Sequence, residues 1–277
     1  MVFPRITIVT CSFNQGRFLE KTILSVLNQN YPNLEYIIID GGSTDNSPEI
    51  IKKYADRLAY WVSEKDRGQT HALIKGLSRA SGEMQGWLCS DDLLEPGALR
   101  EVAEFFATHS KVRWVYGDAC WINTNGRFVK WKREIPFCPF IWLHDHNYIP
   151  QPATFWRRDL YEQVGGLDES FKLAMDADLF WRFSRIAQPC HVRKLWARMR
   201  SHPGQRNKTL RAESDVEDMR IRAKYLGRTP TAFELAGKFI IAKSLRITYK
   251  LFTGCYFAPR PPELEIPVGT SRSSNNK

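Results

Sequence analysis

The first hundred residues repeat one pattern four times: a short, mostly apolar run, a polar cluster, and a segment of helical periodicity. The apolar runs are residues 6–9, 36–39, 60–62 and 84–88. A strand that is apolar at every position is buried on both faces, and alternation of such strands with helices is typical of a parallel sheet covered by helices. We therefore expect an α/β fold with a mostly parallel central sheet.

Length and composition narrow the class of protein. The chain has 277 residues, of which 43% are hydrophobic, so it can bury a sizeable core as one domain with an appendage. No stretch approaches the ~18 uncharged apolar residues of a membrane span, and the N-terminus lacks the apolar run of a signal peptide. The six cysteines are scattered without a CxxC pair, which favours free thiols in a reducing cytoplasm.

The excess of basic charge is concentrated near the C-terminus. Residues 201–277 carry 14 basic and 7 acidic side chains (14 − 7 = +7), whereas residues 1–200 carry 26 and 23 (26 − 23 = +3). A nucleic-acid-binding surface interleaves basic residues with aromatic ones, but seven of the nine tryptophans lie between residues 111 and 197. The sequence therefore argues against a nucleic-acid partner.

Polar clusters follow the four predicted strands directly, at residues 10–15, 40–45, 64–68 and 90–92. Ligands of open α/β sheets bind beyond the carboxyl ends of the strands, so we expect these clusters to form one binding site. Loops between strands and helices are commonly polar, but that alternative does not explain why aspartates stand directly at strand ends.

The adjacent carboxylates Asp91 and Asp92 are the first candidates for chemistry. Adjacent like charges are tolerated in solvent, beside cations or around a metal. Oxygen ligands without a nearby Cys or His cluster favour Mg²⁺ or Mn²⁺. The alternative is that Ser90 or Asp91 caps a helix over residues 92–106.

Two further aspartates are candidates. Asp40 opens a Gly-rich turn over residues 40–45, where its carboxylate can accept hydrogen bonds from a nucleotide's base or ribose. The turn matches neither a P-loop nor a dinucleotide fingerprint, and a plain turn is the alternative. Asp176 lies where an apolar helix begins, so it either stabilises the helix dipole or serves as a general base.

Five segments together resemble family-2 glycosyltransferases, which have the glycosyltransferase-A fold. They follow one another in that family's order and spacing, over about residues 4–205. The segments are Ile-Thr-Ile-Val-Thr (6–10) with Phe13-Asn14, Asp-Gly-Gly-Ser-Thr-Asp (40–45), Ser-Glu-Lys-Asp-Arg-Gly (63–68), Gly-Trp-Leu-Cys-Ser-Asp-Asp (86–92) and Met-Asp-Ala-Asp-Leu (175–179). The resemblance implies an inverting transfer of a sugar from a nucleotide-diphosphate donor.

The resemblance implies roles for the residues on the donor side. Asp40 matches the aspartate that recognises the nucleotide base, with Thr10, Phe13 and Asp66 lining the same pocket. The donor is expected to be a UDP-sugar.

The same resemblance implies a catalytic centre around Asp91 and Asp92. These match the end of the family's Asp-x-Asp-Asp element, which binds the ribose and, through Mg²⁺ or Mn²⁺, the diphosphate. Asp92 and His202 are the expected metal ligands, and Asp176 matches the general base. In two places the sequence departs from the family. Cys89 replaces the first Asp of the metal element, and Ile74 replaces an Asn expected near the donor.

The acceptor side is less marked. The segment Gln-Pro-Ala-Thr-Phe-Trp (151–156) combines polar and aromatic residues suited to sugar stacking, so Gln151 and Trp156 are the expected acceptor contacts, with core packing as the alternative for Trp156. His144-Asp145-His146 is expected to be a solvated loop rather than a metal site.

These inferences divide the chain. Residues 1–210 are expected to form a Rossmann-like glycosyltransferase-A domain, with a nucleotide-sugar half at 1–110 and an acceptor half at 111–210. Residues 211–258 are expected to form a basic helical extension, and residues 259–277 a disordered tail.

The expected role is sugar transfer to a glycan or lipid-linked acceptor in cell-surface polysaccharide or glycolipid synthesis. One alternative is a metal-dependent nucleotidyltransferase, although the loop at residues 10–15 lacks the expected Gly-rich phosphate site. The other is a non-catalytic sugar- or nucleotide-binding relative, in view of Cys89 and Ile74.

The predicted C-terminal helix, residues 231–257, spaces Lys243, Arg246 and Lys250 three and four apart. A basic helix face is attracted to anionic lipid, which would hold a cytoplasmic enzyme against the inner face of the cell membrane. Packing of this helix onto the catalytic domain is the alternative.

Overall fold

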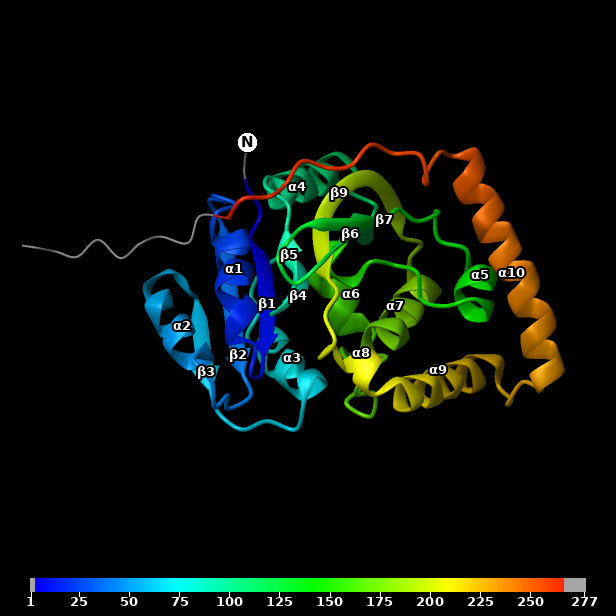
Figure 1. Cartoon of the computed structure of the whole chain (residues 1–277), viewed down its shortest axis with the longest axis horizontal. Coiled ribbons are helices and arrows are strands. Elements are labelled where there is room, and N and C mark those ends of the chain that lie inside the picture. The colour runs from blue at the N-terminus through cyan, green and yellow to red at the C-terminus, as the bar shows by residue number, and fades with distance from the viewer. Residues whose placement is uncertain (1–2, 267–277) are drawn as a thin grey trace, which may run out of the picture.

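The computed structural model describes residues 3–266, except the side chain of Ala232 (Figure 1). The strands are β1 (Ile6–Ser12), β2 (Leu34–Asp40), β3 (Tyr60–Ser63), β4 (Met84–Cys89), β5 (Leu93–Leu94), β6 (Trp114–Ile122), β7 (Phe128–Lys132), β8 (Thr154–Arg157) and β9 (Cys190–Arg200). The helices are α1 (Gly16–Leu27), α2 (Ser47–Lys53), α3 (Gln69–Leu77), α4 (Ala98–Thr108), α5 (Pro139–His144), α6 (Arg158–Gln163), α7 (Met175–Ile186), α8 (Arg206–Thr209), α9 (Arg211–Leu226) and α10 (Ala232–Phe252), with short 3₁₀ turns η1 (Ala55–Arg57) and η2 (Gln151–Ala153).

All strands belong to one sheet in the order β3-β2-β1-β4-β8-β6-β9-β5, with β7 paired to β6 outside this path. The four strands predicted from apolar runs are all present, and β3, β2, β1 and β4 pair in parallel. The second half is mixed: β8 is antiparallel to both β4 and β6, while β6 and β9 are parallel. The parallel half carries the predicted polar loops at its carboxyl edge.

Alternating side chains of the strands divide the core between the two faces of the sheet. Ile6 and Ile8 of β1 pack with α1, α2 and α4, whereas Val9 and Cys11 pack with α3, α5, α6 and α7. Because both faces of β1, β2 and β4 are covered, these strands are apolar at most positions. This burial explains why their positions were predictable from the sequence.

Helices occupy the predicted extension, and they share the core of the domain. Ile221 of α9 is 2% exposed and Ala242 of α10 is fully buried, both in the cluster that contains α7. The helix α10 lies at the opposite end of the molecule from α2 (Figure 1). Among the described residues, no helix is long and apolar enough to cross a bilayer.

Residues 258–266, here called the C-terminal strap, run back from α10 across the molecule toward α1 (Figure 1). Trp131 Nε1 donates to Pro259 O at 3.0 Å, and Arg198 Nη2 donates to Pro262 O at 2.8 Å. Ile266 packs against the core beneath α1 and α4. The predicted disorder from residue 259 is therefore wrong for 259–266, because these residues make buried contacts. Residues 267–277 lie outside the described part.

Candidate active site

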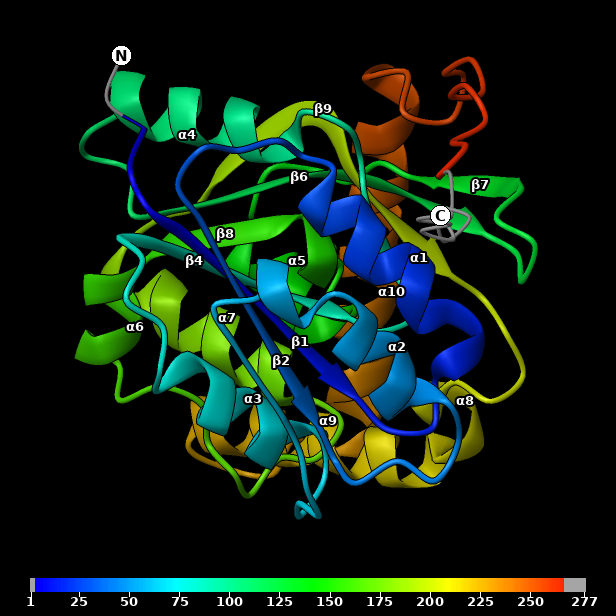
Figure 2. The same ribbon diagram turned by 90° about the vertical axis from the view of Figure 1, so that its left-hand side faces the viewer.

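The loops that follow β1, β2, β3 and β4 meet at one edge of the sheet. The arrowheads of β1 and β2 point the same way (Figure 2), and register pairs Ser12 with Asp40 and Cys11 with Cys89. The edge strand β3 pairs Ser63 with Asp40. The expected binding edge is therefore assembled from segments up to 80 residues apart.

On the donor side, Asp40 is fully buried at the end of β2. Its carboxylate accepts hydrogen bonds from Ser43 N at 2.9 Å, Ser43 Oγ at 2.6 Å and Ser63 Oγ at 2.7 Å. A carboxylate has about four acceptor positions, so Asp40 holds the Gly-rich turn against β3 with three of them. Its predicted contact with a base would use the remaining position.

Asp66 lies directly against this turn. A Cβ atom at Gly41 would stand 2.7 Å from Asp66 Oδ2, so the glycine lets the Asp66 carboxylate approach the turn closely. Asp66 Oδ1 also accepts from Gly68 N at 2.7 Å, which shapes the loop before α3. The structure thus brings Asp40 and Asp66 together, as the predicted pocket requires.

The two predicted donor residues of the first loop differ in position. Phe13 is 59% exposed beyond the end of β1 and is accessible to a ligand. Thr10 is fully buried, with its hydroxyl 3.0 Å from Tyr36 Oη. Side chains alternate along a strand, and Thr10 points to the α1 face, away from Cys11. The prediction that the Thr10 side chain lines the pocket is therefore wrong, because this side chain is buried on the other face of the sheet.

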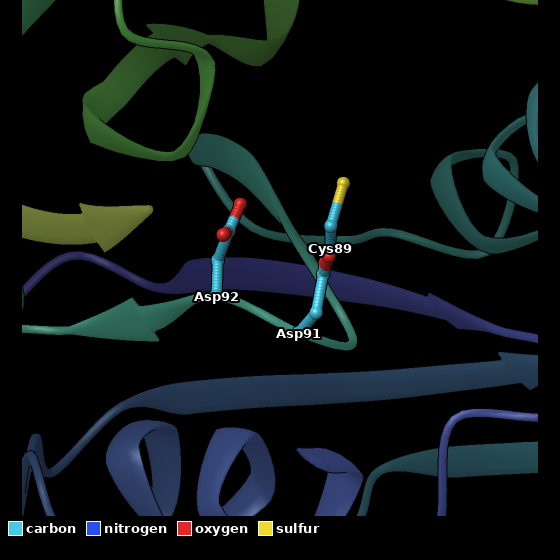
Figure 3. A group of neighbouring side chains, drawn as sticks. All are labelled: Cys89, Asp91 and Asp92. Atoms are coloured by element: carbon cyan, nitrogen blue, oxygen red, sulfur yellow. The ribbon is translucent and has the colours of Figure 1, made fainter. Parts of the chain in front are cut away.

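Cys89, Asp91 and Asp92 form a compact cluster at the end of β4 (Figure 3). One ligand atom from each lies within 4.8 Å of the others. The next helix, α4, begins at Ala98, so Asp91 does not cap a helix over 92–106. The alternative of a simple helix cap is thereby excluded for this pair.

The electrostatics of the cluster fit a divalent cation. Burial raises the pKa of Asp92 well above its ordinary value, and the neighbouring charge of Asp91 raises it further. The contact with Cys11 and burial raise the pKa of the Cys89 thiol, and a protonated thiol is a poor ligand for a hard cation. The two carboxylates are the ligands of this cluster that would suit a hard cation.

The end of β9 holds the two carboxylates in place. Arg200, 1% exposed, donates from its backbone N–H to Asp92 Oδ1 at 2.8 Å and from Nε to Asp91 O at 2.8 Å. His202 Nε2 lies 3.0 Å from Asp91 Oδ2. His202 thus reaches the rim of the cluster, beside Asp91 rather than among the three converging ligand atoms. No motif in the sequence marks Arg200, so its role is visible only in the structure.

Gln151 lies beside the cluster and Trp156 does not. Gln151 Nε2 donates to Trp87 O at 2.8 Å, and its Oε1 is 3.8 Å from Cys89 Sγ. Trp156 is fully buried within the central strand β8, with Nε1 bonded to Gln85 at 3.2 Å. Stacking on a sugar needs an accessible ring face. The predicted acceptor contact of Trp156 is therefore wrong, because its ring packs in the core.

Asp176 lies in the first turn of α7 and is partly buried. Burial raises the pKa of its carboxyl to about 6, and the charge of Asp218 on α9 adds to this rise. Asn147 Nδ2 donates to Asp176 Oδ2 at 3.0 Å, which favours the charged form. A carboxyl that titrates near neutrality suits proton transfer.

Asn147 is itself held in one orientation. Its Oδ1 accepts from Trp142 Nε1 at 3.3 Å and from Ile149 N at 3.2 Å. Because the oxygen is occupied by two donors, the amide NH₂ group faces Asp176. This residue has no motif signal in the sequence and was missed.

Helix α9 supports the same turn of α7. The Glu217 carboxylate accepts from the backbone N–H groups of Lys172, Leu173 and Ala174, each at 2.8 Å. These residues precede Asp176 directly, so Glu217 fixes where α7 begins. The residue lies in the segment predicted as a basic extension, and its role was not foreseen.

One short segment connects Asp176 with the metal cluster. Asn147 contacts Asp176, and Gln151, four residues later, contacts Cys89. An extended chain spans at most about 3.5 Å per residue, so the Cα atoms of Asn147 and Gln151 are separated by no more than ~14 Å. Segment 147–151 therefore contacts the general-base candidate at one end and the cluster of Cys89, Asp91 and Asp92 at the other.

Curated relatives share this chain's sequence over most of its length. An uncharacterized glycosyltransferase of Mycobacterium tuberculosis is 29% identical over 194 residues, covering 69% of this chain and 72% of the relative. One of Rickettsia typhi is 24% identical over 217 residues, covering 74% and 67%.

Solved structures share its architecture. S. aureus TarS 1-349 in complex with UDP-GlcNAc has a TM-score of 0.65 at 18% identity, covering 89% of this chain and 75% of that one. The mannosyltransferase PcManGT from Pyrobaculum calidifontis in complex with GDP-Man and Mn²⁺ has a TM-score of 0.63 at 19% identity, covering 88% and 70%. The likeness shows the expected glycosyltransferase-A fold. The family model described as glycosyl transferase family 2 matches residues 7–165, more than half of the chain, and the chain therefore belongs to that family.

Proposed function

We propose that this glycosyltransferase is an inverting enzyme that moves a sugar from a nucleotide-diphosphate donor to a hydroxyl of a glycan or lipid-linked acceptor. The observation that carries the proposal is the pairing of Asp176, with a pKa of about 6, with the Asp91–Asp92 cluster across segment 147–151. A base on one side and a site for the leaving diphosphate on the other are what a single displacement needs.

The donor in this proposal is a UDP-sugar. TarS is solved in complex with UDP-GlcNAc and PcManGT in complex with GDP-Man, which supports a nucleotide sugar as the class of donor. Asp40 and Asp66 would contact the base, Phe13 would lie against it, and Asp91 would contact the ribose.

The metal in this proposal is Mg²⁺ or Mn²⁺, held by Asp92 with Asp91, and with His202 at the rim. PcManGT is solved with Mn²⁺, and the buried, like-charged carboxylates of this chain fit a divalent cation. When bound, such a cation supplies positive charge that stabilises the diphosphate leaving group.

The proposed chemistry uses Asp176 as the base. Its carboxylate takes the proton of the acceptor hydroxyl as that oxygen bonds to the anomeric carbon. The bond from the anomeric carbon to the diphosphate oxygen breaks, and its electron pair leaves with the nucleoside diphosphate. Attack from the face opposite the leaving group inverts the anomeric centre. A positioned base of this kind contributes ~10²–10⁴-fold to the rate.

The acceptor side of the proposal includes Gln151, which lies beside the cluster. We place the enzyme in the cytoplasm, peripherally at the inner face of the cell membrane, in cell-surface polysaccharide or glycolipid synthesis. Membership of glycosyl transferase family 2 argues against the nucleotidyltransferase alternative.

The test is a screen of UDP-, GDP- and dTDP-sugars for binding and slow hydrolysis, with and without Mn²⁺. We expect one UDP-sugar to bind and to be hydrolysed in the presence of Mn²⁺. Asp176→Asn should keep the binding and lower turnover by ~10²-fold or more, while Asp92→Ala should weaken Mn²⁺-dependent binding. Binding without turnover under every condition would favour the non-catalytic alternative.

A further inference from the structure

In a typical amphipathic helix the apolar face packs on the protein and the charged face meets solvent. In α10 a face with three cations packs on the protein instead. Its inner face consists of Lys238, Ala242, Arg246 and Lys250, spaced four residues apart so that they share one side. Ala242 is fully buried and Lys250 is 7% exposed. Of the three cations that the sequence assigned to a membrane-facing surface, Arg246 and Lys250 therefore face the protein, whereas Lys243 is exposed.

Two buried carboxylates explain this orientation. Glu134 is 2% exposed and Asp145 is 6% exposed. Arg246 Nε pairs with Asp145 Oδ2 at 2.5 Å, and Lys250 Nζ pairs with Glu134 Oε1 at 3.2 Å. Burial opposes ionisation of Glu134, but Lys132, Lys250 and Arg246 outweigh it and lower its pKa. Buried carboxylates require such partners, so the cations of α10 are committed to the domain.

The outer face of α10 is accessible and mostly apolar, with the small polar residues Ser244 and Thr248 between the apolar ones. Its large hydrophobic side chains, each about half exposed or more, are Phe233, Ile240, Ile241, Leu245, Leu251 and Phe252. No acidic residue occurs from Leu235 to Pro262, whereas Lys243 is exposed at the rim of this face. Contiguous exposed apolar surface with a polar rim marks an interaction site.

We propose that this outer face of α10 docks on the surface of an anionic lipid bilayer. An interfacial helix buries its apolar side at the headgroup boundary while lysines at its edge reach anionic lipid. A second copy of this face offers Lys243 no acidic residue between Leu235 and Pro262, whereas anionic lipid offers it a counter-charge, so charge complementarity favours lipid. The inference deepens the proposed membrane location and does not depend on the proposed catalysis.

The docking face lies on the acceptor side of the molecule. Arg246 of α10 is paired with Asp145, two residues from Asn147, which holds Asp176. A bilayer against α10 would therefore stand near the segment that positions the base. This arrangement suits an acceptor carried by a lipid.

The experiment is flotation of the full-length chain with vesicles of phosphatidylcholine alone and of phosphatidylcholine with 30% phosphatidylglycerol. We expect flotation with the mixed vesicles that largely survives 0.5 M NaCl. Ile241→Ser with Phe252→Ser should weaken binding tenfold or more. The matched control is Val129→Ser with Ile186→Ser, which changes two exposed apolar residues on other elements and should leave binding unchanged.

Three results would overturn the proposal. The first is no flotation with either vesicle. The second is flotation that salt abolishes and the Ile241/Phe252 variant retains, which would mean attraction by charge alone. The third is a concentration-dependent dimer in light scattering that the same variant loses, which would assign the face to a second copy. Donor hydrolysis without lipid should be equal in wild type and variant, so a failure here is distinct from failure of the proposed chemistry.

Discussion

At the scale of residues, the site depends on how two groups of carboxylates are held. Asp91 and Asp92 are fixed by Arg200, and Asp176 is fixed by Asn147. Burial raises the pKa of both Asp92 and Asp176, but their partners differ: Asp92 accepts from the backbone N–H of Arg200, and Asp176 accepts from the side-chain amide of Asn147. In the proposed function Asp92 holds a cation and Asp176 accepts a proton.

The raised pKa of Asp176 predicts the pH dependence of the reaction. A general base must be deprotonated, and this carboxyl has a folded-state pKa of about 6, so turnover should fall as pH drops below about 6. Initial rates of donor hydrolysis between pH 4.5 and 8 measure this fall in rate, the acid limb of the pH–rate profile. A rate that stays constant down to pH 4.5 would contradict the assignment of Asp176 as the base.

Replacing Asn147 should move that limb. Its hydrogen bond lowers the pKa of Asp176, so Asn147→Leu should raise this pKa and shift the acid limb upward by about one pH unit, the equivalent of ~1.4 kcal/mol. Asn125→Leu, at an exposed position in the turn between β6 and β7, is the control and should leave the profile in place. A lower rate with an unshifted profile would mean that Asn147 acts only on folding.

At the scale of elements, α9 belongs to the catalytic half. Glu217 accepts three backbone hydrogen bonds ahead of α7, and Ile221 enters the core one turn later. A carboxylate that accepts backbone N–H groups at a helix start stabilises it like an N-cap. The helix therefore transmits the packing of the C-terminal region to the position of Asp176.

Glu217→Gln should loosen the start of α7. The substitution removes the charge and places an amide donor against N–H groups, which should cost ~1–3 kcal/mol of stability and lower turnover more than donor binding. Thermal melting and separate measurement of donor affinity and turnover test this. Glu213→Gln, an exposed position one turn earlier on α9, is the matched control. If the two substitutions change stability and turnover equally, Glu217 does not position the start of α7.

At the scale of the whole molecule, the C-terminal strap joins α10 to the first half of the sheet. Arg198, 1% exposed, donates to Pro262 O and pairs with Glu95 at 2.5 Å. Leu264 and Ile266 cover apolar side chains at the edge of the core. The strap therefore adds contacts between the C-terminal end of the described chain and the core.

Truncation after Phe257 should destabilise the protein by about 2 kcal/mol or more, because Arg198 loses a buried acceptor and apolar surface is exposed. For a domain of this size the melting temperature should fall by roughly 4–8 °C. Truncation after Ile266 retains every contact of the strap and is the control. Equal melting temperatures of the two truncated chains would mean that the strap contributes nothing.

Several of these features were readable in the sequence, for a physical reason. A strand buried on both faces must be apolar throughout, so the four parallel strands and the polar clusters at their ends follow from local composition. Asp91, Asp92 and Asp176 stand in such local patterns. Asn147, Arg200 and Glu217 do not, because each acts on a partner between 29 and 109 residues away along the chain.

The amino-acid sequence by itself determined the α/β class, the parallel half of the sheet, the family and the carboxylates available for chemistry. Only the tertiary structure decided which way a side chain points when the sequence pattern is compatible with both a buried and an exposed position. Thr10 and Trp156 are buried because of the face of the sheet to which they point. The helix α10 turns its cations inward because Glu134 and Asp145 are buried beneath it. Helical periodicity states which residues share a face, whereas the charge of the surface beneath decides which face turns inward.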